Sequence, residues 1–117
     1  MLKKKTLDGN LESLILAVLE DGETYGYRLI EQLNELGHGH LKLGEGSIYP
    51  VLQRLESRGL VKPTWRVGDN GRRRKYYRLT RPGVRALADN RAQWAGLQEV
   101  MARILTPTSN LCTGESS

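Results

Sequence analysis

Apolar residues recur at helical spacing in two successive segments near the start of the chain, which predicts two short amphipathic helices. In the first segment Asp8 or Asn10 is a candidate N-cap, and Gly22 ends the pattern. Its apolar positions are Leu7, Leu11, Leu14, Ile15, Val18 and Leu19. The second segment begins near Thr24 and stops at Gly37. Its predicted inner positions are Tyr27, Ile30, Leu33 and, as a further candidate, Leu36.

A third helix is predicted after the loop GHGHLKLGEG, and Gly59 ends it. Ser47 is a candidate N-cap, and Pro50 is acceptable in the first turn because an amide there has no helical partner to lose. The predicted inward positions are Ile48, Val51, Leu52 and Leu55. The opposite face is polar and carries Ser47, Tyr49, Gln53, Arg54 and Arg58.

Two alternating segments follow and predict an antiparallel hairpin. The first runs over residues 60–67 and places Val61, Pro63, Trp65 and Val67 on one side. In the second, after Gly71, Tyr77 and Leu79 continue an apolar face. Asn70 and Gly71 tolerate the positive φ that a tight turn requires. Pro63 lacks an amide donor, so its strand should lie at an edge of the sheet.

The last predicted element is a long helix from Arg81 to about Leu105, with Thr80 as its cap, Pro82 in its first turn and Pro107 beyond its end. Its a and d heptad positions are apolar except Asn90, and Val100 flanks them. A chain this small has no core left to bury such a stripe, so the helix should pair with its copy in a second subunit, helped by the first helix. The expected dimer-interface residues are Leu11, Leu87, Trp94, Leu97, Met101, Ile104 and Leu105.

The predicted fold class is therefore mainly α with a β-hairpin wing. We expect a winged helix-turn-helix domain over residues 1–80, a C-terminal dimerisation helix over residues 81–105, and a disordered polar tail over residues 106–117. The single cysteine, Cys112, excludes an internal disulfide. No apolar run approaches the roughly 20 residues of a membrane span, and the N-terminus lacks a secretory core. These features predict a cytoplasmic protein.

Positive charge is concentrated in the predicted hairpin. The chain carries a formal net charge of +5, which favours polyanions only weakly. Between Leu60 and Thr80, however, the anion Asp69 stands against the cations Lys62, Arg66, Arg72, Arg73, Arg74, Lys75 and Arg78. Consecutive like charges in a strand repel one another unless a polyanion relieves them. A solvated wing and a targeting signal are the alternative interpretations.

A DNA interface would combine the third helix with this hairpin, because the major groove admits one helix and exposes base edges that Arg and Gln recognise. Gln53 and Arg54 are then candidate base readers, whereas Ser47 and Tyr49 suit phosphates; the alternative is an ordinary solvated helix face. The N-terminal lysines are either a phosphate-seeking arm or an ordinary soluble terminus. The candidate DNA-binding residues are Lys3, Lys4, Lys5, Tyr25, Lys42, Ser47, Tyr49, Pro50, Gln53, Arg54, Arg72, Arg73, Arg74 and Lys75.

Catalytic and metal-binding patterns do not emerge from the sequence. His38 and His40, separated by one glycine in a predicted loop, supply neither three ligands nor a fixed geometry for a metal. The sequence contains no G-x-S-x-G motif, no P-loop and no cysteine pair. We expect no enzymatic activity, no metal and no cofactor.

Three stretches of the sequence together resemble the PadR family of bacterial transcriptional regulators. They are LEDGETYGYRLIEQL, GSIYPVLQRLESRGLV and GRRRKYYRLTRPG, and the resemblance spans roughly Leu11 to Leu105. The most specific parts are YGY at residues 25–27, the block at residues 48–56, and YYRLT at residues 76–80 followed by Gly83. The short, single C-terminal helix looks like the smaller subfamily.

The resemblance implies a homodimeric winged helix-turn-helix repressor that binds an inverted-repeat operator in double-stranded DNA. It places Ser47, Tyr49, Pro50, Gln53 and Arg54 on the recognition helix and residues 72–75 on the wing. In the multidrug-sensing members, a tryptophan at the position matching Trp94 sandwiches flat aromatic drugs between two subunits. The candidate effector-binding residues are Trp94, Leu97, Asn90, Gln98, Leu14 and Val18.

The function predicted from these features is repression that a small hydrophobic or aromatic effector relieves. An indole in a dimer seam serves packing as well as ligand binding, and other PadR members sense phenolic acids or no known small molecule. A regulator without an effector and a protein-interaction module that does not use DNA therefore remain the alternatives.

Overall fold

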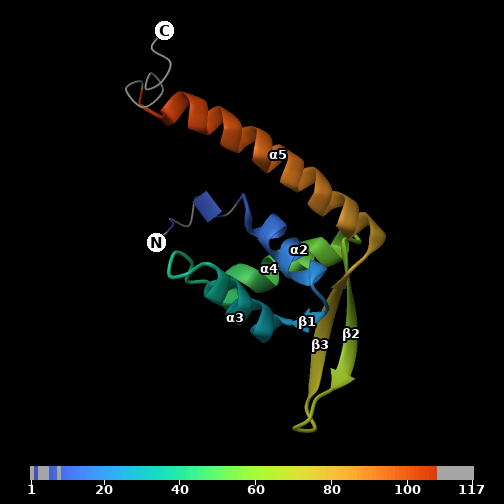
Figure 1. Ribbon diagram of the computed structural model, residues 1–117. Coiled ribbons are helices and arrows are strands. Elements are labelled where there is room, and N and C mark those ends of the chain that lie inside the picture. Colours follow the sequence, from blue (N-terminus) through green and yellow to red (C-terminus); the bar gives the residue numbers. More distant parts are fainter. Residues whose placement is uncertain (1, 3–5, 8, 108–117) are drawn as a thin grey trace. The chain divides into compact units, whose positions relative to one another are not determined.

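The computed structural model describes residues 2, 6–7 and 9–107 and has the predicted class of fold, mainly α with a β-hairpin wing (Figure 1). The elements are α2 (Leu11–Glu20), β1 (Thr24–Tyr25), α3 (Gly26–Leu36), α4 (Glu45–Ser57), β2 (Val61–Val67), β3 (Arg73–Leu79) and α5 (Arg81–Leu105). The chain divides into two compact units, Met1–Leu87 and Ala88–Ser117, and the boundary between them lies within α5. Lys3, Lys4, Lys5, Asp8 and Cys112 lie outside the described residues.

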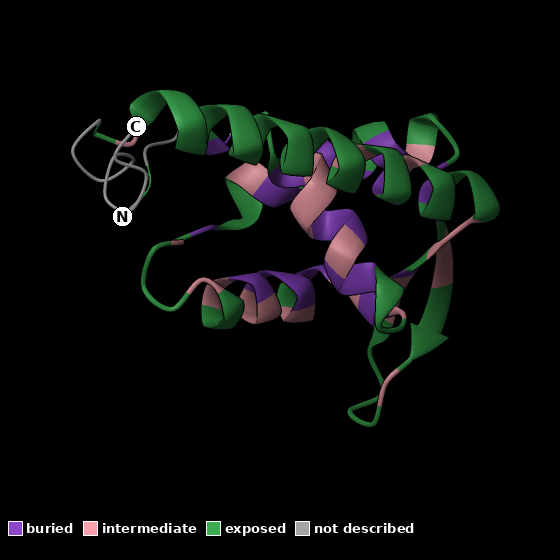
Figure 2. Ribbon diagram, turned by 45° about the horizontal axis from the view of Figure 1, so that its top comes forward, coloured by how far each residue is buried: buried purple, intermediate pink, exposed green. Residues whose placement is uncertain are grey.

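The core of the first unit is formed by one apolar face from each of the helices α2, α3 and α4 (Figure 2). Because an α-helix advances about 100° per residue, positions three and four apart share a face. The buried positions of α2 are Leu11, Ile15, Leu16, Val18 and Leu19. Those of α4 are the four predicted residues, Ile48, Val51, Leu52 and Leu55. Within the described residues, no helix is both long and apolar enough to cross a membrane.

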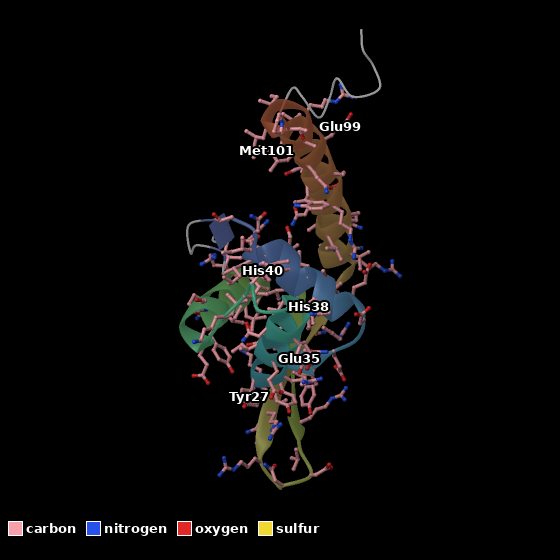
Figure 3. All side chains as sticks on the ribbon, turned by 60° about the vertical axis from the view of Figure 1, so that its left-hand side comes forward. Tyr27, Glu35, His38, His40, Glu99 and Met101 are labelled. Atoms are coloured by element: carbon pink, nitrogen blue, oxygen red, sulfur yellow. The ribbon has the colours of Figure 1, made fainter. Side chains whose placement is uncertain are left out.

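The inner face of α3 differs from the predicted one. Tyr27 and Leu36 were expected inside, but they are 59% and 66% exposed. The buried stripe is instead Gly26, Leu29, Ile30 and Leu33. At 100° per residue, Tyr27 lies about 110° and Leu36 about 70° from the centre of that stripe, on opposite sides of it. Figure 3 shows Tyr27 and Glu35 along α3, where both are exposed.

The start of α4 also differs from its prediction. Gly44 occupies the N-cap position, and its carbonyl accepts hydrogen bonds from the Ser47 and Ile48 amides at 3.1 and 3.2 Å. Ser47 is therefore already helical and is not the cap. Pro50 consequently lies inside the helix, beyond the first turn. The carbonyl that it leaves without an amide partner belongs to Gly46, which is exposed and can bind water.

The connection between α3 and α4 is anchored by one asparagine side chain. The Asn34 amide nitrogen donates to the Leu43 carbonyl at 3.0 Å, and its oxygen accepts from the Leu43 amide at 2.8 Å. Leu43 itself is buried in the core. This pair of bonds sets where α4 begins relative to α3.

The hairpin forms as predicted, with β2 and β3 antiparallel from Val61 opposite Leu79 to Val67 opposite Arg73. The strand order is β1-β3-β2, so Pro63 lies on an edge strand, as its missing amide required. Gly71 has a φ of 78° in the turn, the left-handed region that glycine tolerates. The short strand β1 was not predicted, and it pairs Thr24 with Tyr77 and Tyr25 with Tyr76.

The first turns of α5 are held firmly against the end of α4. The Thr80 hydroxyl caps the helix as predicted, because it accepts from the Gly83 amide at 3.1 Å and donates to the Gly59 carbonyl at 2.6 Å. Gly83 is buried. A Cβ on Gly83 would stand 2.0 Å from the Leu60 carbonyl oxygen. This part of α5 therefore belongs to the core of the first unit.

Burial changes the predicted dimer seam and effector site. Leu11, Leu87 and Val18 are only 4%, 2% and 7% exposed in the single chain, so these side chains serve the core and leave almost no surface for a partner. Leu14 is half-buried against the same core. In the second unit, the a and d positions beyond Asn90 remain exposed in the single chain. The large apolar side chains there that are 46–73% exposed are Trp94, Leu97, Val100, Met101, Ile104 and Leu105.

Replacement of Gly83 by alanine should destabilise the protein, because the added methyl group meets backbone atoms of Leu60 that cannot turn aside. We expect a loss of about 1–3 kcal/mol in the free energy of unfolding, the usual cost of overpacking, measured by urea denaturation. Gly96 is the matched control, since it lies in the same helix with open space around its Cβ position. Gly96→Ala should raise stability by up to about 1 kcal/mol through helix propensity. Equal urea midpoints for Gly83→Ala and the unmodified protein would contradict the packing argument.

Candidate nucleic-acid interface

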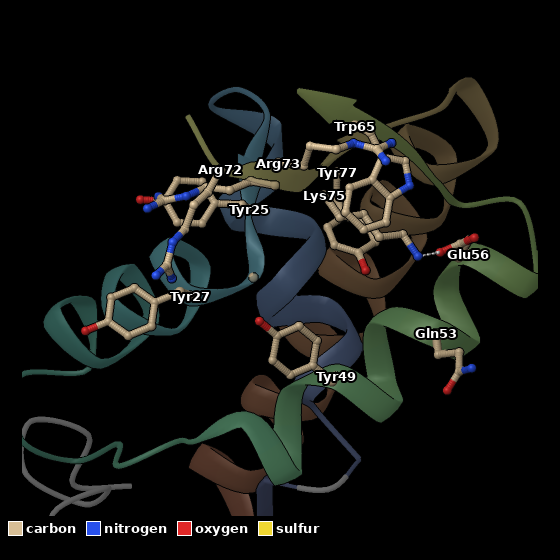
Figure 4. A pocket seen from close by; sticks show the side chains of 12 residues that line it. Tyr25, Tyr27, Tyr49, Gln53, Glu56, Trp65, Arg72, Arg73, Lys75 and Tyr77 are labelled. Atoms are coloured by element: carbon tan, nitrogen blue, oxygen red, sulfur yellow. Dashed lines mark ion pairs between the residues drawn. The ribbon is translucent and has the colours of Figure 1, made fainter. Parts of the chain in front are cut away.

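A groove of about 750 Å³ lies in the first unit, between α4 and the wing. Its walls come from α4, from the start of α3 and from the two long strands (Figure 4). The lining residues are Tyr25, Gly26, Tyr27, Tyr49, Gln53, Glu56, Trp65, Arg72, Arg73, Arg74, Lys75 and Tyr77. The combination of aromatic rings, cations and a helix edge suits a polyanion with flat bases.

The α4 wall of the groove consists of Tyr49, Gln53 and Glu56. These positions are four and three residues apart, so they share one face of the helix. Of the other predicted recognition residues, Arg54 and Pro50 are exposed and Ser47 is half-buried, but none of them lines the groove. Lys42 is exposed in the loop before α4 and also lies outside the groove lining.

Tyr49 packs across the start of α3, and Gly26 makes this possible. A Cβ on Gly26 would stand 2.5 Å from the Tyr49 hydroxyl oxygen. Partial burial is the largest cause that raises the pKa of the Tyr49 phenol, and the nearby Glu45 carboxylate adds to it. The phenol therefore stays protonated at neutral pH and remains a hydrogen-bond donor. Its side chain is still 40% exposed, so the hydroxyl can reach a ligand.

Two of the arginines that line the groove lie over aromatic rings. The Arg74 guanidinium carbon is 4.4 Å from the centre of the Tyr25 ring, and that of Arg73 is 5.0 Å from the centre of a Trp65 ring. The Tyr25 ring in turn meets Tyr76 edge to face at 5.3 Å. Cation–π contact orients a guanidinium without neutralising its charge. Tyr25, a candidate DNA-binding residue from the sequence, contacts Arg74 and Tyr76 through its ring.

Carboxylates engage two further cations of the hairpin. The Lys75 ammonium lies 3.1 Å from a carboxylate oxygen of Glu56 on α4, and Arg66 pairs with Glu23. The hydrogen bond that the Lys75 ammonium donates to the Glu56 carboxylate is the largest cause that raises the pKa of Lys75. We expected that only a polyanion could relieve the repulsion among the wing cations. That expectation is wrong in part, since rings and carboxylates of the same chain already relieve some of it.

Several lining residues were missed by the sequence analysis. Glu56 follows Gln53 by three positions, so helical spacing alone could have placed it on the same face. Tyr27 lines the groove although it was assigned to the core, and Trp65 and Tyr77 were assigned only to a strand face. Their participation depends on how the hairpin docks beside α4, which no local pattern encodes.

The fold and this basic groove define a winged-helix protein of the DNA-binding class. Residues 15–89 match the family model described as the Transcriptional regulator PadR-like family. The chain therefore belongs to the PadR-like family of transcriptional regulators. Members of this family bind DNA and regulate transcription; the family is not one of enzymes.

Individual relatives agree with this assignment. The transcriptional regulator Rv3488 of Mycobacterium tuberculosis is 37% identical over 91 residues, which cover 78% of each chain. The crystal structure of a PadR-like transcriptional regulator from Bacillus cereus has a TM-score of 0.78 at 34% identity, and the match covers 89% of this chain and 99% of that one. A transcriptional regulator from Clostridium thermocellum, at 23% identity and a TM-score of 0.82, shares the fold over 91% of this chain and 100% of that one.

Proposed function

We propose that this regulator is a repressor that binds duplex DNA with α4 in the major groove and the β2–β3 hairpin against the neighbouring backbone or minor groove. The observation that carries the proposal is the groove in which the polar face of α4 and the arginines of the wing line a single concave surface. The major groove of DNA admits one helix, and a charged hairpin beside that helix can reach the neighbouring backbone or minor groove.

Within this interface, Gln53 and Arg54 are proposed to read base edges. Both are exposed on α4, and Gln suits adenine while Arg suits guanine. Tyr49 and Ser47 are proposed to hold phosphates, with the protonated Tyr49 phenol as a donor. Arg72, Arg73 and Arg74 are proposed to neutralise backbone charge. The stacking of Arg73 and Arg74 on rings supports this role, because side chains that are already ordered lose less entropy on binding.

The protein is further proposed to act as a homodimer joined through α5. Trp94, Leu97, Met101 and Ile104 occupy a and d positions and are 46–73% exposed in the single chain. An apolar stripe of this kind is typical of a helix that packs against another copy. Two-fold symmetry would present two α4 helices to an inverted repeat, whose half-sites lie about 34–36 Å apart along the duplex.

Release from DNA is proposed to follow when a small hydrophobic or aromatic molecule binds near Trp94 at the dimer centre. This part rests on the resemblance to the multidrug-sensing members and on the exposure of Trp94, 57% in the single chain. The mechanism is a population shift, in which the ligand favours a dimer whose α4 helices no longer match successive major grooves. Asn90 and Gln98, together with Leu97, are the proposed further contacts.

Substitution should separate sequence-independent from sequence-dependent contacts. Selection from random duplexes supplies a preferred site, and a scrambled duplex of equal composition serves as the reference. Arg73→Ala should weaken binding to both duplexes and reduce the log–log salt slope by about 0.9. Gln53→Ala should cost about 1–3 kcal/mol on the preferred site alone. Arg103→Ala on α5 removes the same charge and should leave the salt slope unchanged. Identical behaviour of the first two variants on both duplexes would refute the division of roles.

A charge placed in the α5 stripe should break the dimer. Leu97→Asp buries a carboxylate in the proposed seam, where it lacks a partner. We expect this variant to sediment as a monomer at micromolar concentrations and to lose its preference for an inverted repeat. Ala92→Asp is the control, because Ala92 lies on the outward f position of the same heptad frame and should leave the dimer intact. A monomeric unmodified protein would eliminate this part of the proposal.

Trp94 fluorescence should report effector binding. In a Trp65→Phe background, flat aromatic compounds that stack on Trp94 should quench its emission and lower the affinity for the preferred DNA site. In a Trp94→Phe protein, the remaining Trp65 emission should not respond. Unchanged emission from Trp94 across such a panel would favour a regulator without an effector.

A further inference from the structure

One acidic side chain interrupts the basic groove. Among the described residues that line it, Glu56 is the single carboxylate, and it faces the wing from α4 (Figure 4). Its oxygen lies 3.1 Å from the ammonium of Lys75 on β3. The two side chains are 35% and 33% exposed and both line the groove, so the pair is accessible to a ligand there. A carboxylate at this place opposes the phosphates that the other residues attract.

The wing cations differ in the kind of partner they have. Arg73 and Arg74 are oriented by Trp65 and Tyr25, and these rings leave the positive charge available to phosphate. Lys75 also lies over a ring, that of Tyr77 at 5.4 Å, but its charge is neutralised by Glu56. The nearby carboxylate repels phosphate, so Lys75 attracts the DNA backbone less strongly while the pair is closed. Among the described cations that line the groove, Lys75 is therefore the one whose charge a carboxylate neutralises.

We propose that Glu56 is a positioning residue of the DNA interface, which holds Lys75 away from the phosphate backbone and so limits the affinity for DNA of any sequence. This inference rests on the proposed DNA-binding mode. With weaker attraction to the backbone, a larger share of the affinity comes from base contacts made by α4. This helps a regulator to dissociate from the many non-specific sites of a genome. A repulsive element of this kind is one way in which binding proteins avoid wrong partners.

The test compares Glu56→Gln with the unmodified protein on the preferred and scrambled duplexes across several salt concentrations. The substitution keeps the side-chain volume and frees Lys75 to contact one phosphate. Each such contact steepens the log–log salt slope by about 0.9. If affinity at 1 M salt is unchanged, this corresponds to roughly eightfold tighter binding at 0.1 M salt. We expect both changes on both duplexes. Glu99→Gln removes the same charge from an exposed pair with Arg103 on α5 and should leave the slope unchanged.

Two further variants separate electrostatic control from simple support of the fold. In Glu56→Gln/Lys75→Gln no ammonium remains, so the slope should return to that of the unmodified protein. Lys75→Gln alone should weaken binding with little change in the salt slope. If Lys75 already contacted a phosphate in the unmodified protein, this substitution would instead reduce the slope by about 0.9.

The outcomes distinguish this inference from the proposed function. DNA binding by the unmodified protein together with an unchanged slope for Glu56→Gln overturns the inference alone. A gain that persists in the double variant also overturns it. Absence of binding to either duplex at low salt overturns the proposed function, and this inference with it.

Discussion

The burial of one face of α4 is the constraint on which the rest of the structure depends. Ile48, Leu52 and Leu55 are completely buried against the other elements of the first unit. Because side chains follow one another at about 100° around a helix, burying this face leaves Tyr49 and Gln53 directed outward. The hydrophobic effect that stabilises the small core thus also orients the surface that we propose to meet DNA. The asparagine bonds before α4 and the Thr80 cap after the hairpin hold both ends of this arrangement.

The wing shows how a chain with many neighbouring cations folds before any polyanion is present. Arg73 and Arg74 lie over aromatic rings, which do not neutralise their charge. The charge of Lys75 is neutralised by the Glu56 carboxylate. The cost of like charges is reduced within the protein, and the positive surface persists in part. In the proposed binding mode, the side chains that contact the wing cations therefore influence both the stability of the fold and the affinity for DNA.

Periodicity predicted the helices and the hairpin well, because each depends on residues close in sequence. It failed where two faces of one helix are similarly apolar. Tyr27 looked like a core residue, yet Leu29 takes that position, since the sum of contacts with other elements decides the rotation of α3. Ser47 looked like a cap, but Gly44 starts the helix earlier, where the Asn34 contact with Leu43 ends the loop. Local propensity is a weak guide when tertiary contacts compete with it.

The sequence by itself determined the order of the helices and the hairpin, the turn at Gly71, the cap at Thr80 and the family to which the chain belongs. Only the tertiary structure decided that β1 joins β3, that Gly83 abuts the Leu60 carbonyl, and that Glu56 reaches Lys75. It also moved Leu87 from the expected seam into the core. The physical reason is separation along the chain. The features that the sequence determined depend on spacings within one element, whereas the others depend on residues that meet only when separate elements pack together.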